Sequence, residues 1–262
     1  MGPFKDIGVV KTGHVALVEI RRPPHNFFDV ALIKELAAAF EALDADPDCR
    51  ALVLAAQGKA FCAGADFGGD DSDGSALLSG PTPGAAHLYI EGNRLFRTKK
   101  PIVAAIHGAA VGGGLGLAMV GDLRVTCPEA RFCANFTRLG FHPGFGLTVT
   151  LPAVIGPSKA ALLFYTSRRV GGEEAFAMGL ADVLVPQHQV RSGALALAAE
   201  IAENAPLGLA ATRATLRGDI ADRVRAATEH ELAEQMRLRK TEDFKEGVKA
   251  MAERRVPVFT NR

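Results

Sequence analysis

The chain has 262 residues, of which 48% are hydrophobic and 23% charged, and its formal net charge is +1. This length and composition are typical of a soluble globular protein that buries a full core. The near-zero charge gives no electrostatic basis for binding nucleic acid or an anionic membrane surface. No run reaches the ~18 apolar residues of a membrane span, and the N-terminal residues "MGPFKDIGVV" contain no apolar signal core. We therefore expect a cytoplasmic protein.

The cysteines are too scattered to suggest a metal site. Cys49, Cys62, Cys127 and Cys133 form no CxxC pair and have no metal-ligand spacing. We expect four free thiols, as is usual in a reducing compartment, and no bound metal.

The first half of the chain alternates strand and helix patterns. Residues 7–20 contain two β-rich runs around Thr12 and Gly13, which predicts a hairpin. Residues 28–46 predict an amphipathic helix with Asp29 as its N-cap, and residues 85–100 predict a second helix. Continuous apolar runs at 50–56, 101–106 and 122–127 predict strands that are buried on both faces. This order indicates βαβ units with right-handed crossovers.

The second half has a different character. From about Gly156 onward the pattern is almost wholly helical, so we expect an α/β core at residues 1–200 and a helical region at residues 201–262. Earlier in the chain, residues 66–86 are rich in Gly, Ser, Pro and Asp, which predicts a mobile surface loop. Ser158 lies in a near match to the G-x-S-x-G nucleophile motif, and we expect it to cap a helix instead.

A glycine-rich segment, "AAVGGGLGLAMVGD" at residues 109–122, asks for an explanation. It holds five glycines, each costing about 1 kcal/mol in a helix interior. A dinucleotide-binding turn would need a third glycine where Leu117 or Met119 stands. Two interpretations remain: a helix beginning near Gly113 exposes backbone N–H groups to a ligand oxygen, or small residues only allow close packing against the sheet.

A second segment favours the first interpretation. "GKAFCAGADF", residues 58–67, follows a predicted strand and places small residues at Ala63, Gly64 and Ala65. Ligands of parallel sheets bind at the carboxyl ends of the strands. Two such turns can therefore direct two N–H donors at one oxygen, which is the arrangement of an oxyanion hole.

These segments resemble the two signature regions of the crotonase (enoyl-CoA hydratase/isomerase) superfamily. The resemblance extends to "RRPPHN" at 21–26, "EEAFAMGLADVLVP" at 173–186 and "DFKEGVKAMAERRVPVF" at 243–259. It implies an α/β fold with a ββα spiral core and a C-terminal helical trimerisation region. It also implies a homotrimer or homohexamer, and an acyl-CoA thioester substrate with no cofactor other than the coenzyme A that the substrate carries.

The resemblance also assigns residues by position. The two oxyanion-hole N–H groups would belong to Ala65 and Gly113, and the segment around Pro24, His25 and Asn26 would lie along coenzyme A. The candidate substrate-binding residues are Pro24, His25, Ala63, Asp66, Phe67, Gly112 and Phe136. Together with Phe141 and Phe145, the phenylalanines at 67 and 136 suggest a hydrophobic acyl group.

The chain departs from the family at the acid/base positions. The two glutamates that activate water in hydratases correspond to Gly116 and Phe136, and the aspartate of related isomerases and dehalogenases falls near Gly144. A dehalogenase histidine falls near Tyr89. Each positioned acid or base contributes about 10²–10⁴ in rate. We therefore expect acyl-CoA binding and enolate stabilisation to persist, while ordinary hydration is weakened.

Another residue could replace the glutamates. His142 is the first candidate, because an imidazole titrates near neutral pH, although a histidine bonded to backbone in a Pro-Gly turn is an alternative interpretation. Asp66, Tyr89 and Glu91 are further candidates. The sequence thus predicts an acyl-CoA enzyme of the hydratase/isomerase type. The alternatives are a decarboxylase, hydrolase or C–C lyase of the same family, or a non-catalytic acyl-CoA-binding protein.

Overall fold

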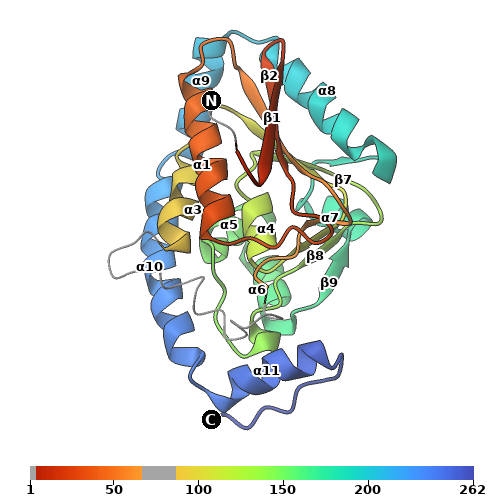
Figure 1. Ribbon diagram of the computed structural model, residues 1–262, viewed down its shortest axis with the longest axis vertical. Helices are drawn as coiled ribbons and strands as arrows, with labels where there is room; N and C mark the ends of the chain where they lie inside the picture. The colour runs from red at the N-terminus through yellow and green to blue at the C-terminus, as the bar shows by residue number, and fades with distance from the viewer. Residues whose placement is uncertain (1–3, 67–86) are drawn as a thin grey trace.

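The computed structural model describes residues 4–66 and 87–262, and its core contains two β-sheets (Figure 1). The six strands of the first sheet are, in spatial order, β1 (Ile7–Thr12), β2 (Val15–Ile20), β3 (Ala51–Ala56), β5 (Ile102–Ile106), β7 (Leu123–Thr126) and β10 (Val183–Leu184). The four strands of the second sheet are β4 (Ala60–Cys62), β6 (Ala109–Val111), β8 (Arg131–Cys133) and β9 (Arg169–Gly171). The loop expected at 66–86 lies, apart from Asp66, outside the described residues.

The chain winds through both sheets in a repeating spiral. The pairs β3–β4, β5–β6 and β7–β8 each place one strand in the first sheet and the next strand in the second. Neighbouring strands are parallel except for the β1–β2 hairpin and the β8–β9 pair. This arrangement confirms the predicted ββα spiral core and the hairpin around Gly13.

Helices cover the sheets on both sides. They are α1 (Val30–Ala45), α3 (Leu88–Phe96), α4 (Gly113–Ala118), α5 (Leu147–Ile155), α6 (Pro157–Thr166), α7 (Gly172–Met178), α8 (Val190–Ala202), α9 (Pro206–Arg217), α10 (Ile220–Leu238) and α11 (Glu242–Ala252), with 3₁₀ turns η1 (Thr137–Leu139) and η2 (Gln187–Gln189). Helix α8 packs against β2, β3, β5 and β7, while α1 packs on α3. Helix α10 runs along α3 and α5, and α11 crosses the end of the molecule against η1 (Figure 1).

Local sequence explains several of these boundaries. Every residue of β3 is buried, as expected for a parallel strand that is covered on both faces. Helix α1 begins after Asp29, whose Oδ1 accepts a 2.9 Å hydrogen bond from the Leu32 N–H, so the predicted N-cap is confirmed. Thr241 caps α11 in the same way, through the Phe244 N–H at 3.2 Å.

The region after Gly156 is almost wholly helical, as predicted; its exceptions are the three-residue strand β9 and the two-residue strand β10, which complete the two sheets. One prediction about this region is wrong. Ser158 does not cap α6: the N-cap is Gly156 and Ser158 is the second helical residue. A proline at the first helical position starts this helix instead.

The four cysteines are buried free thiols, as predicted. Among the described residues, no single helix has the length and apolar character needed to cross a bilayer; the bent pair formed by 187–202 and 206–238 satisfies the length and composition criteria jointly.

Candidate active site

Two glycine-containing turns touch at the carboxyl ends of β4 and β6. A Cβ atom at Gly64 would lie 2.7 Å from the Val111 carbonyl oxygen, and one at Gly114 would lie 2.0 Å from that of Cys62. Gly64 and Gly112 also have positive φ angles of 85° and 55°. Larger residues would separate the two turns, so close packing accounts for part of the glycine content.

The same two turns carry hydrogen-bond donors that the fold does not use. The backbone N–H groups of Ala65 and Gly113 have no hydrogen-bond acceptor among the described residues. Their neighbours are paired: the Ala63 N–H donates to the His25 carbonyl at 3.0 Å, and the Gly112 N–H donates to the Cys133 carbonyl at 2.8 Å. Both residues are half-buried, and Gly113 is the first residue of α4, where the N–H has no partner within the helix. The two N–H groups are therefore free to bind a ligand oxygen.

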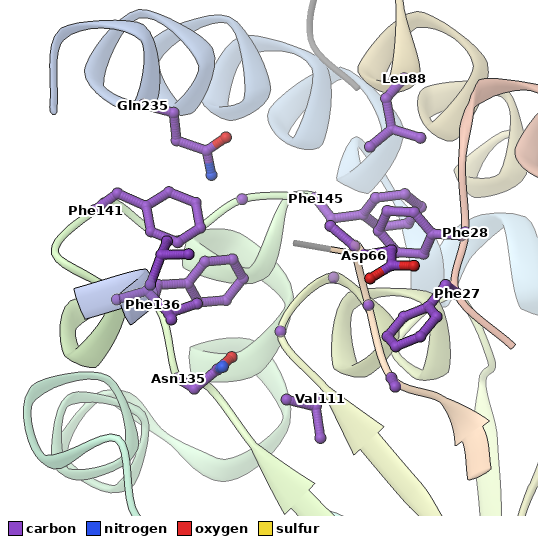
Figure 2. A pocket seen from close by; sticks show the side chains of 18 of the residues that line it. Phe27, Phe28, Asp66, Leu88, Val111, Asn135, Phe136, Phe141, Phe145 and Gln235 are labelled. Carbon is purple, nitrogen blue, oxygen red and sulfur yellow. The ribbon is translucent and has the colours of Figure 1, made fainter. Parts of the chain in front are cut away.

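A cavity of about 350 Å³ borders both N–H groups. Figure 2 shows its aromatic lining, with Phe27 and Phe28 on one side of the two turns and Phe136 and Phe141 on the other. Figure 2 also shows Phe145 beside Phe28, and the two rings are 5.5 Å apart between centroids. This surface suits an apolar group next to a polar oxygen.

The positions expected for acids are occupied by apolar packing. A Cβ atom at Gly116 would lie 2.8 Å from the Cβ of Phe145. The Phe136 ring is buried and meets the Phe141 ring edge-on, with 5.6 Å between centroids. Phe136, which lines the cavity, and Gly116, which packs against the lining residue Phe145, therefore supply no side-chain proton donor or acceptor.

Tyr89 occupies the space beside Gly144, the position that corresponds to the aspartate of related isomerases and dehalogenases. Its hydroxyl group lies so close to Gly144 that a Cβ atom there would be 2.1 Å from the Tyr89 oxygen. The hydroxyl donates to Gln235 Oε1 at 2.9 Å, and Gln235 Nε2 donates to the His142 carbonyl at 2.8 Å. Burial raises the pKa of Tyr89 well above its ordinary value, so the hydroxyl stays protonated near neutral pH.

Only a few other ionisable groups reach the cavity. Among the described residues its lining includes one carboxylate, that of Asp66, and the guanidinium of Arg239. Arg239 also lies over the rings of Phe141 and Phe244, 5.8 Å and 5.7 Å from their centroids. Asp66 directly follows the Ala65 turn, so its side chain is placed beside the oxyanion-hole candidates (Figure 2).

His142 lies outside the cavity lining. Its Nδ1–H donates to the Pro143 carbonyl at 2.8 Å, and its ring meets that of His230 at 5.7 Å. The geometry matches the alternative interpretation, in which a turn histidine bonds to backbone. Glu91, another candidate, is buried in an ion pair with Arg94 and also lies outside the lining.

The remaining candidates separate into two groups. Ala63, Asp66, Gly112 and Phe136 line the cavity together with Ala65 and Gly113. Pro24 and His25 do not: their side chains are exposed, and their carbonyls accept hydrogen bonds from the N–H groups of Lys59, Ala60 and Ala63. They support the turn from outside. Phe67 lies outside the described residues.

Sequence patterns missed several lining residues. Phe28 comes from the segment after β2, and Asn135 follows β8. Gln235 lies in α10, Arg239 in the turn after it, and Met251 in α11. The helical contributors lie far from the glycine turns in sequence, and no local motif marks them. The described residues contain no group of three or more His, Cys, Asp or Glu side chains arranged to hold a metal.

Comparison with known proteins identifies the family. Residues 11–262 match the model of the enoyl-CoA hydratase/isomerase family. The chain is 36% identical over 263 residues to a putative enoyl-CoA hydratase of Thermus thermophilus, covering 95% of this chain and 99% of that one. It is also 32% identical over 253 residues to a probable enoyl-CoA hydratase of Bacillus subtilis, covering 94% and 95% of the two chains.

Solved structures agree with this assignment. The fold matches a crystal structure of an enoyl-CoA hydratase/isomerase from Pseudoalteromonas atlantica with a TM-score of 0.86 and 28% identity, over 98% of this chain and all of the other. The protein belongs to the enoyl-CoA hydratase/isomerase family, the crotonase superfamily. It is an acyl-CoA-processing enzyme of that family.

Proposed function

We propose that this protein stabilises a thioester enolate of an acyl-CoA substrate and catalyses an isomerase- or lyase-type reaction without the usual pair of glutamates. The observation that carries the proposal is the pair of open N–H groups of Ala65 and Gly113 on contacting turns at one cavity. Two preorganised donors on a thioester oxygen stabilise the negative charge that develops there, each by roughly 10²–10³ in rate.

The empty acid positions decide which chemistry is favoured. Gly116 and Phe136 offer no carboxylate, and packing against Phe145 and Phe141 leaves no room for an ordered water-activating pair. Enolate formation needs the oxyanion hole and one proton acceptor, whereas water addition also needs a group that orients and deprotonates water. This asymmetry supports double-bond isomerisation, decarboxylation or C–C cleavage over hydration.

The proposal gives Asp66 the proton-transfer role. Among the described lining residues it alone carries a carboxylate, and it is adjacent in sequence to the Ala65 donor. Tyr89, which burial keeps protonated, donates its hydroxyl proton to Gln235 and so fixes the orientation of that amide at the cavity wall. The aromatic wall holds the acyl group and keeps water away from the enolate.

A backbone substitution tests the oxyanion hole directly. Ala65→Pro removes the N–H donor, and Ala65→Ser is the matched control because it keeps the donor and alters only the side chain. We expect Ala65→Pro to lower the rate of deuterium exchange into crotonyl-CoA by about 10²-fold or more, and Ala65→Ser to stay near wild type. Equal rates in both variants, with thermal unfolding unchanged, would exclude the donor.

The same assay distinguishes two alternative functions, thioester hydrolysis and non-catalytic acyl-CoA binding. Hydrolysis would release free coenzyme A from the thioester, and a non-catalytic binding protein would bind the ester without exchange. We also propose that the chain assembles as a homotrimer or homohexamer. Exposed apolar side chains support this, with Leu207 and Leu216 of α9 86% and 82% exposed and Tyr165 of α6 80% exposed.

A further inference from the structure

A second and larger cleft adjoins the active-site cavity. It has a volume of about 1180 Å³ and lies between the edge formed by β6, β8 and β9 and the C-terminal part of α11 with the segment that follows. It shares the residues Val111, Asn135, Leu139 and Met251 with the lining of the cavity. A ligand in the cavity can therefore extend into the cleft past these four side chains.

The cleft is lined by an excess of positive charge. Its six arginines are Arg131, Arg138, Arg168, Arg169, Arg254 and Arg255. Among the described residues no Asp or Glu lines it, in a chain whose net charge is only +1. Such a concentration of one sign attracts anions and is a feature of anion-binding clefts.

Five of these guanidinium groups have no carboxylate partner within the described part of the chain, and four of the five also have no backbone acceptor there. Arg255 pairs with Glu246 and Glu253, and Arg131 donates to the carbonyls of its own turn. The described residues offer no ion pair to the other four, which are Arg138, Arg168, Arg169 and Arg254. Their charges are available to a ligand.

The cleft adjoins one particular side of the active-site cavity. The shared residue Asn135 lies on the Phe136 and Phe141 side of the turns, opposite Phe27, Phe28 and Asp66 (Figure 2). The shared residue Leu139 belongs to the 3₁₀ turn that Phe136 caps, and α11, which carries Met251, packs on that turn. The cleft therefore opens from this second side of the cavity. A ligand with its thioester at Ala65 and Gly113 therefore has one end directed at the arginines.

We propose that the arginine cleft binds an anionic group at one end of the thioester ligand. The inference rests on the proposed function, whose oxyanion hole fixes the thioester, and it adds a substrate property. Guanidinium groups bind carboxylates and phosphates through paired N–H donors. The segment expected along coenzyme A contains His25, whose ring contacts Phe27 on the opposite side of the turns, so the end of the ligand that faces the arginines is the acyl end. The anion that we propose is therefore a carboxylate at the far end of the acyl group.

Calorimetric binding of matched esters distinguishes an acyl carboxylate from the phosphates of coenzyme A. Butyryl-CoA and glutaryl-CoA carry a methyl and a carboxylate end respectively, and neither has a reactive double bond. We compare wild type with the double variant Arg168→Gln/Arg169→Gln, which should keep the fold because Arg169 is exposed and neither guanidinium has an ion-pair partner among the described residues. Arg225→Gln, an exposed arginine of α10 outside both linings, is the matched control.

An acyl carboxylate in the cleft predicts that wild type binds glutaryl-CoA more tightly than butyryl-CoA, and that the double variant loses about tenfold or more in affinity for glutaryl-CoA alone. Added salt weakens this interaction. Equal weakening of both esters in the double variant, with adenosine 3′,5′-bisphosphate competing only in wild type, would contradict the inference, because the arginines would then hold the phosphates of coenzyme A.

Other results would overturn the inference. Unchanged affinity of the double variant for both esters would exclude the cleft as an anion-binding site. A changed assembly mass in light scattering, with ester affinity retained, would also exclude it, because the arginines would then form a subunit interface. Inorganic pyrophosphate tests the cleft without the oxyanion hole. If wild type bound neither ester, the proposed function would fail, and pyrophosphate binding lost in the double variant would still support the cleft.

Discussion

Gly116 and Phe145 are packed so closely that a Cβ atom on the glycine would lie 2.8 Å from the Cβ of the phenylalanine. Phe145 adopts a positive φ of 61°, and its ring forms part of the wall of the cavity. The glycine therefore does more than omit an acid: the neighbouring ring occupies the space that a side chain would need. The absence of a glutamate at position 116 and the presence of the Phe145 ring in the cavity wall therefore have the same structural cause.

Replacing Gly116 by alanine should destabilise the protein. The added methyl group overpacks a buried contact, which typically costs about 1–3 kcal/mol. Gly208→Ala is the control, because nothing lies within 4 Å of the place that its Cβ would occupy and alanine favours the α9 helix by up to about 1 kcal/mol. Urea unfolding should show a lower free energy for the first variant and an equal or higher one for the second. Equal losses would contradict the packing argument.

Asp66→Asn should separate binding from proton transfer. The amide keeps the size and polarity of the side chain but cannot accept the proton as a carboxylate does. We expect a loss of about 10²-fold or more in deuterium exchange, with the dissociation constant for butyryl-CoA changed little. A variant that exchanges at the wild-type rate would show that Asp66 is not the base.

His142→Ala should leave the chemistry intact. The ring lies outside the cavity and bonds to the Pro143 carbonyl, while the backbone carbonyl that holds Gln235 is retained in the variant. We expect exchange rates within about twofold of wild type, the range of most substitutions away from packed or paired features. A loss of tenfold or more, with folding preserved, would restore His142 as an acid/base candidate.

Glu231 should make stability depend on pH. This fully buried carboxylate on α10 accepts hydrogen bonds from the Gly146 N–H at 2.8 Å and the Thr148 hydroxyl at 2.6 Å, at the start of α5. Burial raises its pKa, so the folded state holds this proton more tightly than the unfolded chain does. Its contribution to stability is full below the ordinary carboxyl pKa and falls as the pH rises through the raised value.

Glu231→Gln isolates that contribution. Glutamine cannot titrate, so the unfolding free energy of wild type minus that of the variant should decrease as the pH is raised from about 4 toward neutrality. Urea unfolding across this range measures the difference. A difference that increases with pH would mean that the hydrogen bonds to Gly146 and Thr148 outweigh burial.

Five strands of the first sheet were predictable from sequence because they span four to six residues and are mostly apolar, whereas the two-residue strand β10 was not. Runs such as "ALVLAA" in β3 stand out from their surroundings, and Asp29 marks the start of α1 with a side chain that does cap it. The second sheet was not predictable. Its strands, such as "AFC" in β4 and "RFC" in β8, span three residues each and are too short to show a period.

The part of the candidate site that could be predicted from the sequence is the part formed by the backbone of the two turns. The turns that carry Ala65 and Gly113 could be located because contacting turns require small residues, and the family resemblance then assigned the two N–H groups by position. Gln235 and Arg239 could not, because which face of α10 meets the cavity depends on how that helix packs on α3 and α5. The catalytic role of His142 stays a prediction: its neighbours Phe141 and Gly144 line the cavity, but its own ring lies outside the lining, which its place in the chain does not reveal.

The most direct test of the central claim is mass spectrometry of crotonyl-CoA after incubation with the pure protein in heavy water. An oxyanion hole without a water-activating pair predicts that deuterium enters the acyl group while no water is added. Addition of water would contradict the account, because some group would then activate water despite the apolar packing at Gly116 and Phe136. An unchanged spectrum, with the ester bound, would contradict enolate formation and favour the non-catalytic acyl-CoA-binding protein.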